Sequence, residues 1–128
     1  MNRAINLRDS NLALVIPDGT SVTVELAPAY LCESIGTPGV DPGNKYLQDV
    51  HFQLTDAEIN ALPSGLPARI DEGIAVVDTI QHHNVLPLPL IHLGATELHL
   101  FTEQTETLRV KASGMVAILV GGRRKVES

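Results

Sequence analysis

The sequence predicts an all-β domain, either an antiparallel β-sandwich or a flattened barrel of about eight to ten strands. From Leu86 to Val126, short apolar runs alternate with polar residues and are interrupted by turns that contain Gly. Two earlier segments, 20–26 and 47–54, alternate in the same way. A period of two with regular turns is typical of antiparallel strands that have one buried and one solvated face.

The N-terminal segment predicts three short strands. Ala4–Leu7 and Leu12–Ile16 are apolar runs, and the polar residues 8–11 form the turn between them. Pro17-Asp18-Gly19 is a second turn that leads into Thr20–Leu26. In this third strand, every second residue is aliphatic, so one face is expected in the core and the other in water.

Residues 36–45 form the one long loop that the sequence predicts. This segment holds three Gly and two Pro and has hardly any apolar side chain to bury. Long loops in compact domains are often binding elements or flexible connectors, so Asp41 and Asn44 are candidate ligand-binding residues. Two oxygen-bearing side chains are too few for a calcium-binding loop, whose spacing is also absent here.

The strongest local pattern predicts a short helix at 56–62. Thr55-Asp-Ala-Glu58 matches a capping box, and Leu54 and Ile59 occupy the positions of a hydrophobic staple around it. Pro63 disfavours helical geometry in the residue before it, so the helix is expected to end near Leu62. We expect this helix to follow strand 47–54 and to cover one open end of the sheet.

The remaining strands are separated by predicted turns. Residues 68–80 are interpreted as a hairpin with Gly73 in its turn, after Asp71 and Glu72. Pro87 and Pro89 indicate that segment 85–93 is an edge strand, or that its proline positions face away from a neighbouring strand, because proline cannot donate a ladder hydrogen bond. The further turns are predicted at 93–94, 104–105 and 113–114.

The segment Met115–Val120 is apolar on both faces. A strand of this kind is expected either at the centre of the sheet or against a second subunit. The candidate residues for an oligomer interface are Met115, Val116, Ile118 and Leu119.

Composition and charge exclude several classes of function. The chain has a net charge of −6, and segment 9–108 holds fourteen acidic residues against two basic ones. Basic residues gather at the two ends, and 121–128 is interpreted as a basic C-terminal tail. An acidic body with few aromatic rings argues against a nucleic-acid partner, since nucleic-acid binding needs basic side chains for the phosphates and aromatic side chains for stacking of single-stranded bases.

The 128 residues are expected to form one β domain. Cys32 is the only cysteine, so no disulfide can form within the chain, and the N-terminus lacks the apolar core of a signal peptide. The longest aliphatic runs are too short to span a bilayer. We therefore expect a cytoplasmic protein without a membrane partner.

Five histidines are the residues best able to carry chemistry. In the predicted strands His92 and His99 lie about 13 Å apart, too far to share a metal ion, and adjacent His82 and His83 point to opposite faces. No catalytic motif, metal site or cofactor site is therefore expected. The candidate ligand-binding residues besides those in the loop are Asp49, His51, Glu97 and His99.

Two functions remain open. The first is a non-enzymatic binding or assembly module, with a homo-oligomer or another protein as its partner, that uses an apolar strand face and the 36–45 loop. The second is a small-molecule-binding protein or metal-assisted enzyme with a pocket in the mouth of the barrel. Such a pocket would draw its polar groups from Glu33, His51, Glu97 or His99.

Overall fold

The computed structural model describes residues 2–38 and 40–126 and confirms the all-β antiparallel fold. All ten strands belong to one sheet. The strands are β1 (Asn2–Asn6), β2 (Asn11–Asp18), β3 (Ser21–Ser34), β4 (Gly43–Thr55), β5 (Glu58–Ala61), β6 (Ala68–Val77), β7 (Ile80–His83), β8 (Val85–Leu88), β9 (Ile91–Thr102) and β10 (Thr107–Lys125).

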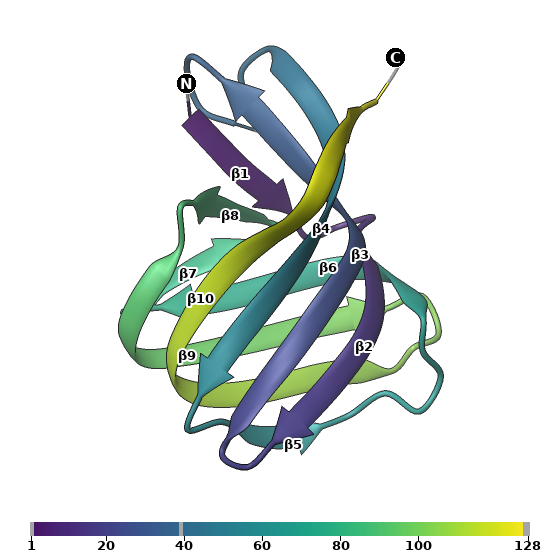
Figure 1. The fold of residues 1–128 in the computed structure, drawn as a ribbon, viewed down its shortest axis with the longest axis vertical. Coiled ribbons are helices and arrows are strands. Elements are labelled where there is room, and N and C mark those ends of the chain that lie inside the picture. The colour runs from purple at the N-terminus through teal and green to yellow at the C-terminus, as the bar shows by residue number, and fades with distance from the viewer. Residues whose placement is uncertain (1, 39, 127–128) are drawn as a thin grey trace.

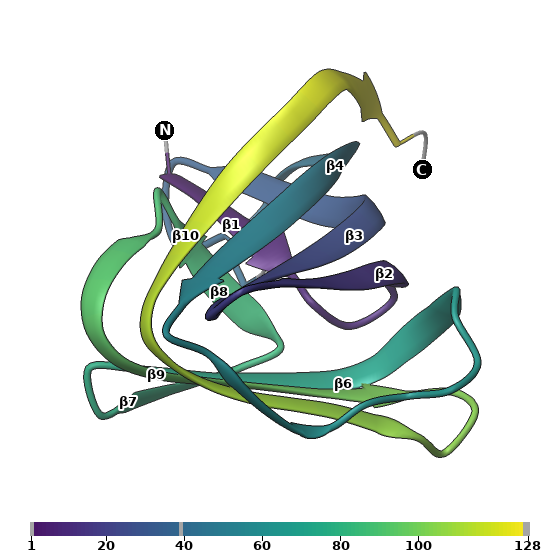
Figure 2. The same cartoon turned by 60° about the horizontal axis from the view of Figure 1, so that its bottom comes forward.

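Six of these strands close into a ring. The order β2-β6-β9-β10-β4-β3 returns to its start because β3 also pairs with β2. The ring is uneven, since β2 and β6 pair only at Asn11–Arg69 and Leu12–Ala68, whereas β3 and β4 pair along most of their lengths. The ring is therefore a flattened barrel with two layers: β2, β3, β4 and the later part of β10 lie in one layer, and β6 and β9 lie in the other (Figures 1 and 2).

The four other strands extend the ring. β1 pairs with β3 and with β8, which makes β8 the end of the strand order, and β5 and β7 pair with β10 and β6. The edge position is therefore confirmed for the part of the segment that contains Pro87, but the single strand predicted at 85–93 is divided into β8 and the start of β9. In Figure 1 the ends of β3, β4 and β10 rise beyond the ring together with β1 and form an upper arm.

Alternating side chains from both layers fill the ring. In the layer of β2, β3, β4 and β10, strand pairing aligns three rows of inward side chains. The middle row contains Val24, Phe52 and Ala117. β6, β9 and β10 supply Ile70, Leu98, Leu100 and Leu108 from the other side, all of them fully buried. The interior is thus occupied by apolar side chains, and the outward residues are left to carry any function.

The predicted helix at 56–62 is wrong, since the described residues contain no helix. Asp56 adopts a left-handed conformation with φ of 47°, and the Ala57 amide donates to the Thr20 carbonyl at 2.7 Å. The chain then continues as β5 along β10, and Ile59 packs against the core. Pairing with a distant strand satisfies the backbone groups that the capping box would have satisfied locally, so the tertiary contact overrides the local preference.

Three predicted turns are also wrong because β6, β9 and β10 run through them. The turn between β6 and β7 lies at Asp78 and Thr79, which both have positive φ, rather than at 71–73. Gly94 and Gly114 lie within β9 and β10, where the pairing shifts register after Ala112. A glycine inside a strand often marks a bulge or bend instead of a turn. The predicted turn at 104–105 is confirmed between β9 and β10.

The predicted loop and tail are both shorter in the structure. Residues 35–38 and 40–42 lie between β3 and β4, and β4 begins at Gly43. Strand β10 continues through Lys125, so 121–125 belong to a strand and not to a tail, and 127–128 lie outside the described residues. The described residues contain no helix that is long and apolar enough to cross a membrane.

Gly73 is required because another side chain crosses β6 at this point. A Cβ atom on Gly73 would lie 2.6 Å from the Leu7 Cβ and 3.2 Å from a methyl carbon of Leu100. Both neighbours are fully buried, so neither can move away without disturbing the core.

We predict that Gly73→Ala lowers the free energy of unfolding by about 1–3 kcal/mol, the usual cost of overpacking a core. Gly122→Ala is the control, because a Cβ at Gly122 meets no atom within 4 Å. Urea unfolding followed by circular dichroism measures both. Equal stability of the two variants would contradict this explanation of Gly73.

Candidate functional site

Strands β2, β3, β4 and β10 lie side by side (Figure 1), and we call the side of these strands that is turned away from the interior the open face. Strand pairing aligns them in two rows that cross all four strands. The first row is Leu14, Glu25, His51 and Ile118. The second row is Ile16, Thr23, Gln53 and Val116, and it continues to the exposed Ile91 on β9.

The open face is apolar at its two margins. On β2, Leu14 and Ile16 are 51% and 43% exposed, and on β10 Ile118 is 38% exposed. Val116 lies on the same side of β10 as Ile118, since side chains two residues apart on a strand share a face. Each margin therefore presents two neighbouring aliphatic side chains, and contiguous exposed apolar surface is where another molecule can bind.

The centre of the open face is polar. Nε2 of His51 lies 3.5 Å from a carboxylate oxygen of Glu25 on the neighbouring strand. Both side chains are partly exposed, so the pair can also be reached from outside the sheet. A partly exposed contact of this kind contributes only about 0–1 kcal/mol to stability, which leaves the carboxylate and the imidazole available to a partner.

The structure divides the four predicted interface residues into two pairs. Val116 and Ile118 point outward on the open face. Met115 is fully buried, and Leu119 packs against the core, so these two belong to the interior. The difference follows from the alternation along β10, because a strand that is apolar on both faces presents only every second residue to the surface.

The predicted ligand residues Asp49 and His51 lie on β4, and they do not converge with the others. Glu97 lies on β9, where its carboxylate is 3.6 Å from Nζ of Lys111. These two residues border a shallow, mostly apolar groove of about 380 Å³. The groove is lined by Val76, Thr79, Ala95, Thr96, Glu97, Lys111 and Ala112.

His99 follows two residues after Glu97 on β9 and is flanked by Arg109 on β10 and Ile74 on β6. Its Nε2 atom is buried without a hydrogen-bond partner, as is that of His92. The two histidines are seven residues apart on the same strand, roughly 23 Å at strand rise, rather than on two strands of a hairpin. The predicted hairpin geometry is wrong, although the separation still prevents a shared ion.

Asp41 and Asn44 border a different depression, of about 340 Å³, beside the loop that joins β3 to β4. Asp41 has a structural role there, because its carboxylate accepts a 2.7 Å hydrogen bond from the Thr37 amide. Asn44 pairs with Glu33 in the ladder between β3 and β4. Within the described residues, no group of three or more His, Cys, Asp or Glu side chains could hold a metal ion.

Cys32 borders the same depression but is a buried thiol. Burial raises the pKa of Cys32, and the positive charge of Lys45 on β4 offsets this only in part. A raised pKa keeps the thiol protonated near neutral pH, whereas a nucleophilic cysteine needs the thiolate. The local chemistry therefore suits a packing residue.

An ion pair that the sequence did not predict joins β10 to β3 within the arm. Arg123 forms a charged hydrogen bond with the Glu33 carboxylate, and its guanidinium lies 4.3 Å from the centre of the Tyr46 ring. Glu33 is only 8% exposed, so Arg123 is the partner of a buried charge. Ninety residues separate the two, and no local pattern could have indicated the contact.

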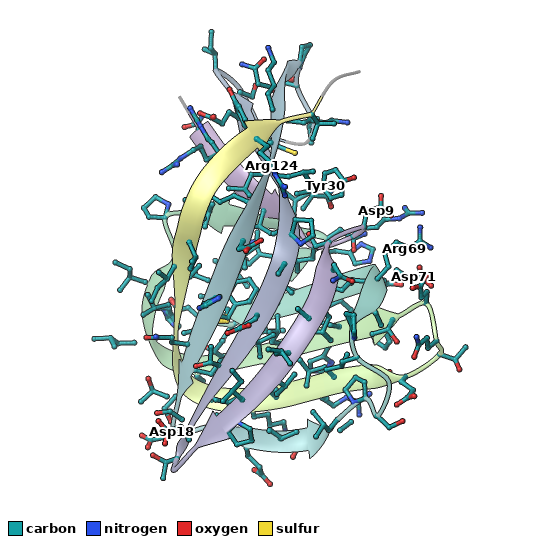
Figure 3. All side chains as sticks on the ribbon, turned by 45° about the vertical axis from the view of Figure 1, so that its right-hand side comes forward. Asp9, Asp18, Tyr30, Arg69, Asp71 and Arg124 are labelled. Carbon is teal, nitrogen blue, oxygen red and sulfur yellow. The ribbon has the colours of Figure 1, made fainter. Side chains whose placement is uncertain are left out.

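A second charged cluster lies on the side of the ring. The Arg69 guanidinium is 3.1 Å from Asp71 and 3.6 Å from both Asp9 and Glu103. Figure 3 shows Arg69 beside Asp9 and Asp71, at the margin where β2 meets β6. All four side chains are about half exposed, so the cluster lies on the protein surface, at the point where β2 and β6 close the ring.

Comparison with protein-family models, curated proteins and solved structures found no match.

We predict that Arg123→Ala lowers the free energy of unfolding by about 1–3 kcal/mol, because it leaves the buried Glu33 carboxylate without its partner. Arg124→Ala is the matched control, since Arg124 is the exposed neighbour on the same strand, and we expect a change within about 0.5 kcal/mol. Chemical denaturation measures both variants. An equal effect of the two substitutions would show that Glu33 does not depend on Arg123.

Proposed function

We propose that this protein is a non-enzymatic assembly module that forms a homo-oligomer through its open face. The observation that carries the proposal is the pair of apolar margins on β2 and β10. Leu14, Ile16 and Ile118 are exposed although the ring has a well-filled interior. Burying these side chains in a contact would stabilise the complex by about 25 cal/mol for each Å² of apolar surface removed from water.

The strand edges support association through a face. β8 ends the strand order with Pro87 and is followed by Pro89, and neither proline can donate a ladder hydrogen bond. Among the described residues, β10 beyond Ala117 is paired on one side only, and there it shifts register before the basic Arg124 and Lys125. Bulges, prolines and basic side chains are devices that prevent strands from pairing between molecules.

The candidate polar residues also support a non-enzymatic role. Glu97 and His99 lie on β9, His51 lies in the open face, and Glu33 is paired with Arg123 in the arm. Acid-base or nucleophilic catalysis needs its groups within hydrogen-bond reach of one another. The ring interior that could have gathered them is filled by the aliphatic core.

We predict that Ile118→Glu converts the oligomer to a monomer, because it places a charge among apolar side chains at the contact. Ile80→Glu is the matched control: Ile80 is 60% exposed on β7, outside the open face, and its replacement should leave the oligomer intact. Sedimentation velocity measures the mass of each variant, and thermal unfolding confirms that both are folded. A monomeric wild-type protein, or dissociation by both substitutions alike, would contradict the proposal.

A further inference from the structure

The open face is arranged so that it matches a second copy of itself. Its strand order is β2, β3, β4, β10, with the apolar margins outside and the polar centre inside. Consider a two-fold axis that runs parallel to the strands, in the plane between two facing sheets and midway between β3 and β4. This axis places β2 of one copy over β10 of the other, and β3 over β4, while each row keeps its height along the strands.

We propose that two copies of the chain pack open face against open face about this axis. The inference rests on the self-association proposed above and adds its register. In the first row, Leu14 packs on Ile118 of the second copy, and Glu25 faces His51 of the second copy. Each contact occurs twice, because residue i meeting j requires j to meet i in a two-fold interface.

The second row is complementary in the same way. Ile16 packs on Val116 of the second copy, and the Thr23 hydroxyl faces the Gln53 amide, which can both donate and accept a hydrogen bond. Apolar groups therefore cover apolar groups at both margins, and polar groups meet partners at the centre. This division is the inverse of the usual one, in which an apolar core is surrounded by a polar rim.

Charge complementarity selects this axis over the other two-fold arrangement. An axis perpendicular to the strands would place each strand over its own copy and would exchange the two rows. Leu14 would still meet an aliphatic residue, Ile16, but Glu25 would face Thr23. The axis parallel to the strands gives the Glu25 carboxylate a second imidazole instead, whose ring N–H can donate a hydrogen bond to it. Electrostatic complementarity of this kind fixes the register of an interface.

The test uses two variants. Each should lose self-association when it is alone, and the two should associate with each other when they are mixed. Leu14→Glu and Ile118→Lys should each weaken self-association by about tenfold or more, since each places two charges opposite aliphatic side chains. In a one-to-one mixture, the introduced carboxylate faces the introduced ammonium on one side of the axis, and Ile118 faces Leu14 on the other. Sedimentation velocity of the mixture should therefore recover the dimer.

The control mixture is Leu14→Glu with Ile16→Lys, which should remain monomeric, because these positions face each other only about the perpendicular axis. A wild-type monomer would overturn the proposed function and the register together. A wild-type dimer without recovery in the first mixture, or with recovery in the control mixture, would overturn the register alone. Ile16→Glu mixed with Val116→Lys reports on the same axis through the second row if a first-row variant fails to fold.

Discussion

Strand β2 closes the ring, and this closure decides which side chains are buried. Leu12 lies at the closing point, where it pairs with Leu26 on β3 and Ala68 on β6, and it is fully buried. Once the ring is closed, each strand has one side toward a common interior. That division buries Met115, leaves no space for a Cβ atom at Gly73, and turns Ile118 to the surface. The open face is thus a consequence of closure.

The charge asymmetry of the chain is partly resolved within the fold. Basic residues from the C-terminal segment pair with acids of the central segment, as Arg123 does with Glu33 and Lys111 with Glu97. The first contact lies within the arm and the second lies between β9 and β10. Each of them connects residues that are distant in the sequence. The polar pair at the centre of the open face, Glu25 with His51, is instead accessible from outside. This pair lies between the aliphatic margins of the open face. In the proposed assembly it sets the register of the two copies.

The sequence predicted the elements whose patterns are local and repeated. Alternation identified the strands, and Pro87 identified an edge, because both follow from the geometry of a single strand. The capping box at Thr55 failed because pairing of β5 with β10 satisfied the same backbone groups. Gly94 was interpreted as a turn, since a bend within a long strand and a turn share the same residue type. The open face depends on register among four strands, which no short-range pattern encodes.

An isotope-filtered nuclear Overhauser experiment on a mixture of labelled and unlabelled protein detects contacts between two copies of the open face. Within one copy, Leu14 and Ile118 are three strand spacings apart, about 14 Å, which is too far for an intramolecular signal. If the two open faces pack as proposed, cross-peaks will connect the methyl groups of Leu14 in one copy with those of Ile118 in the other. Intermolecular cross-peaks that arise only from residues outside the open face would contradict it.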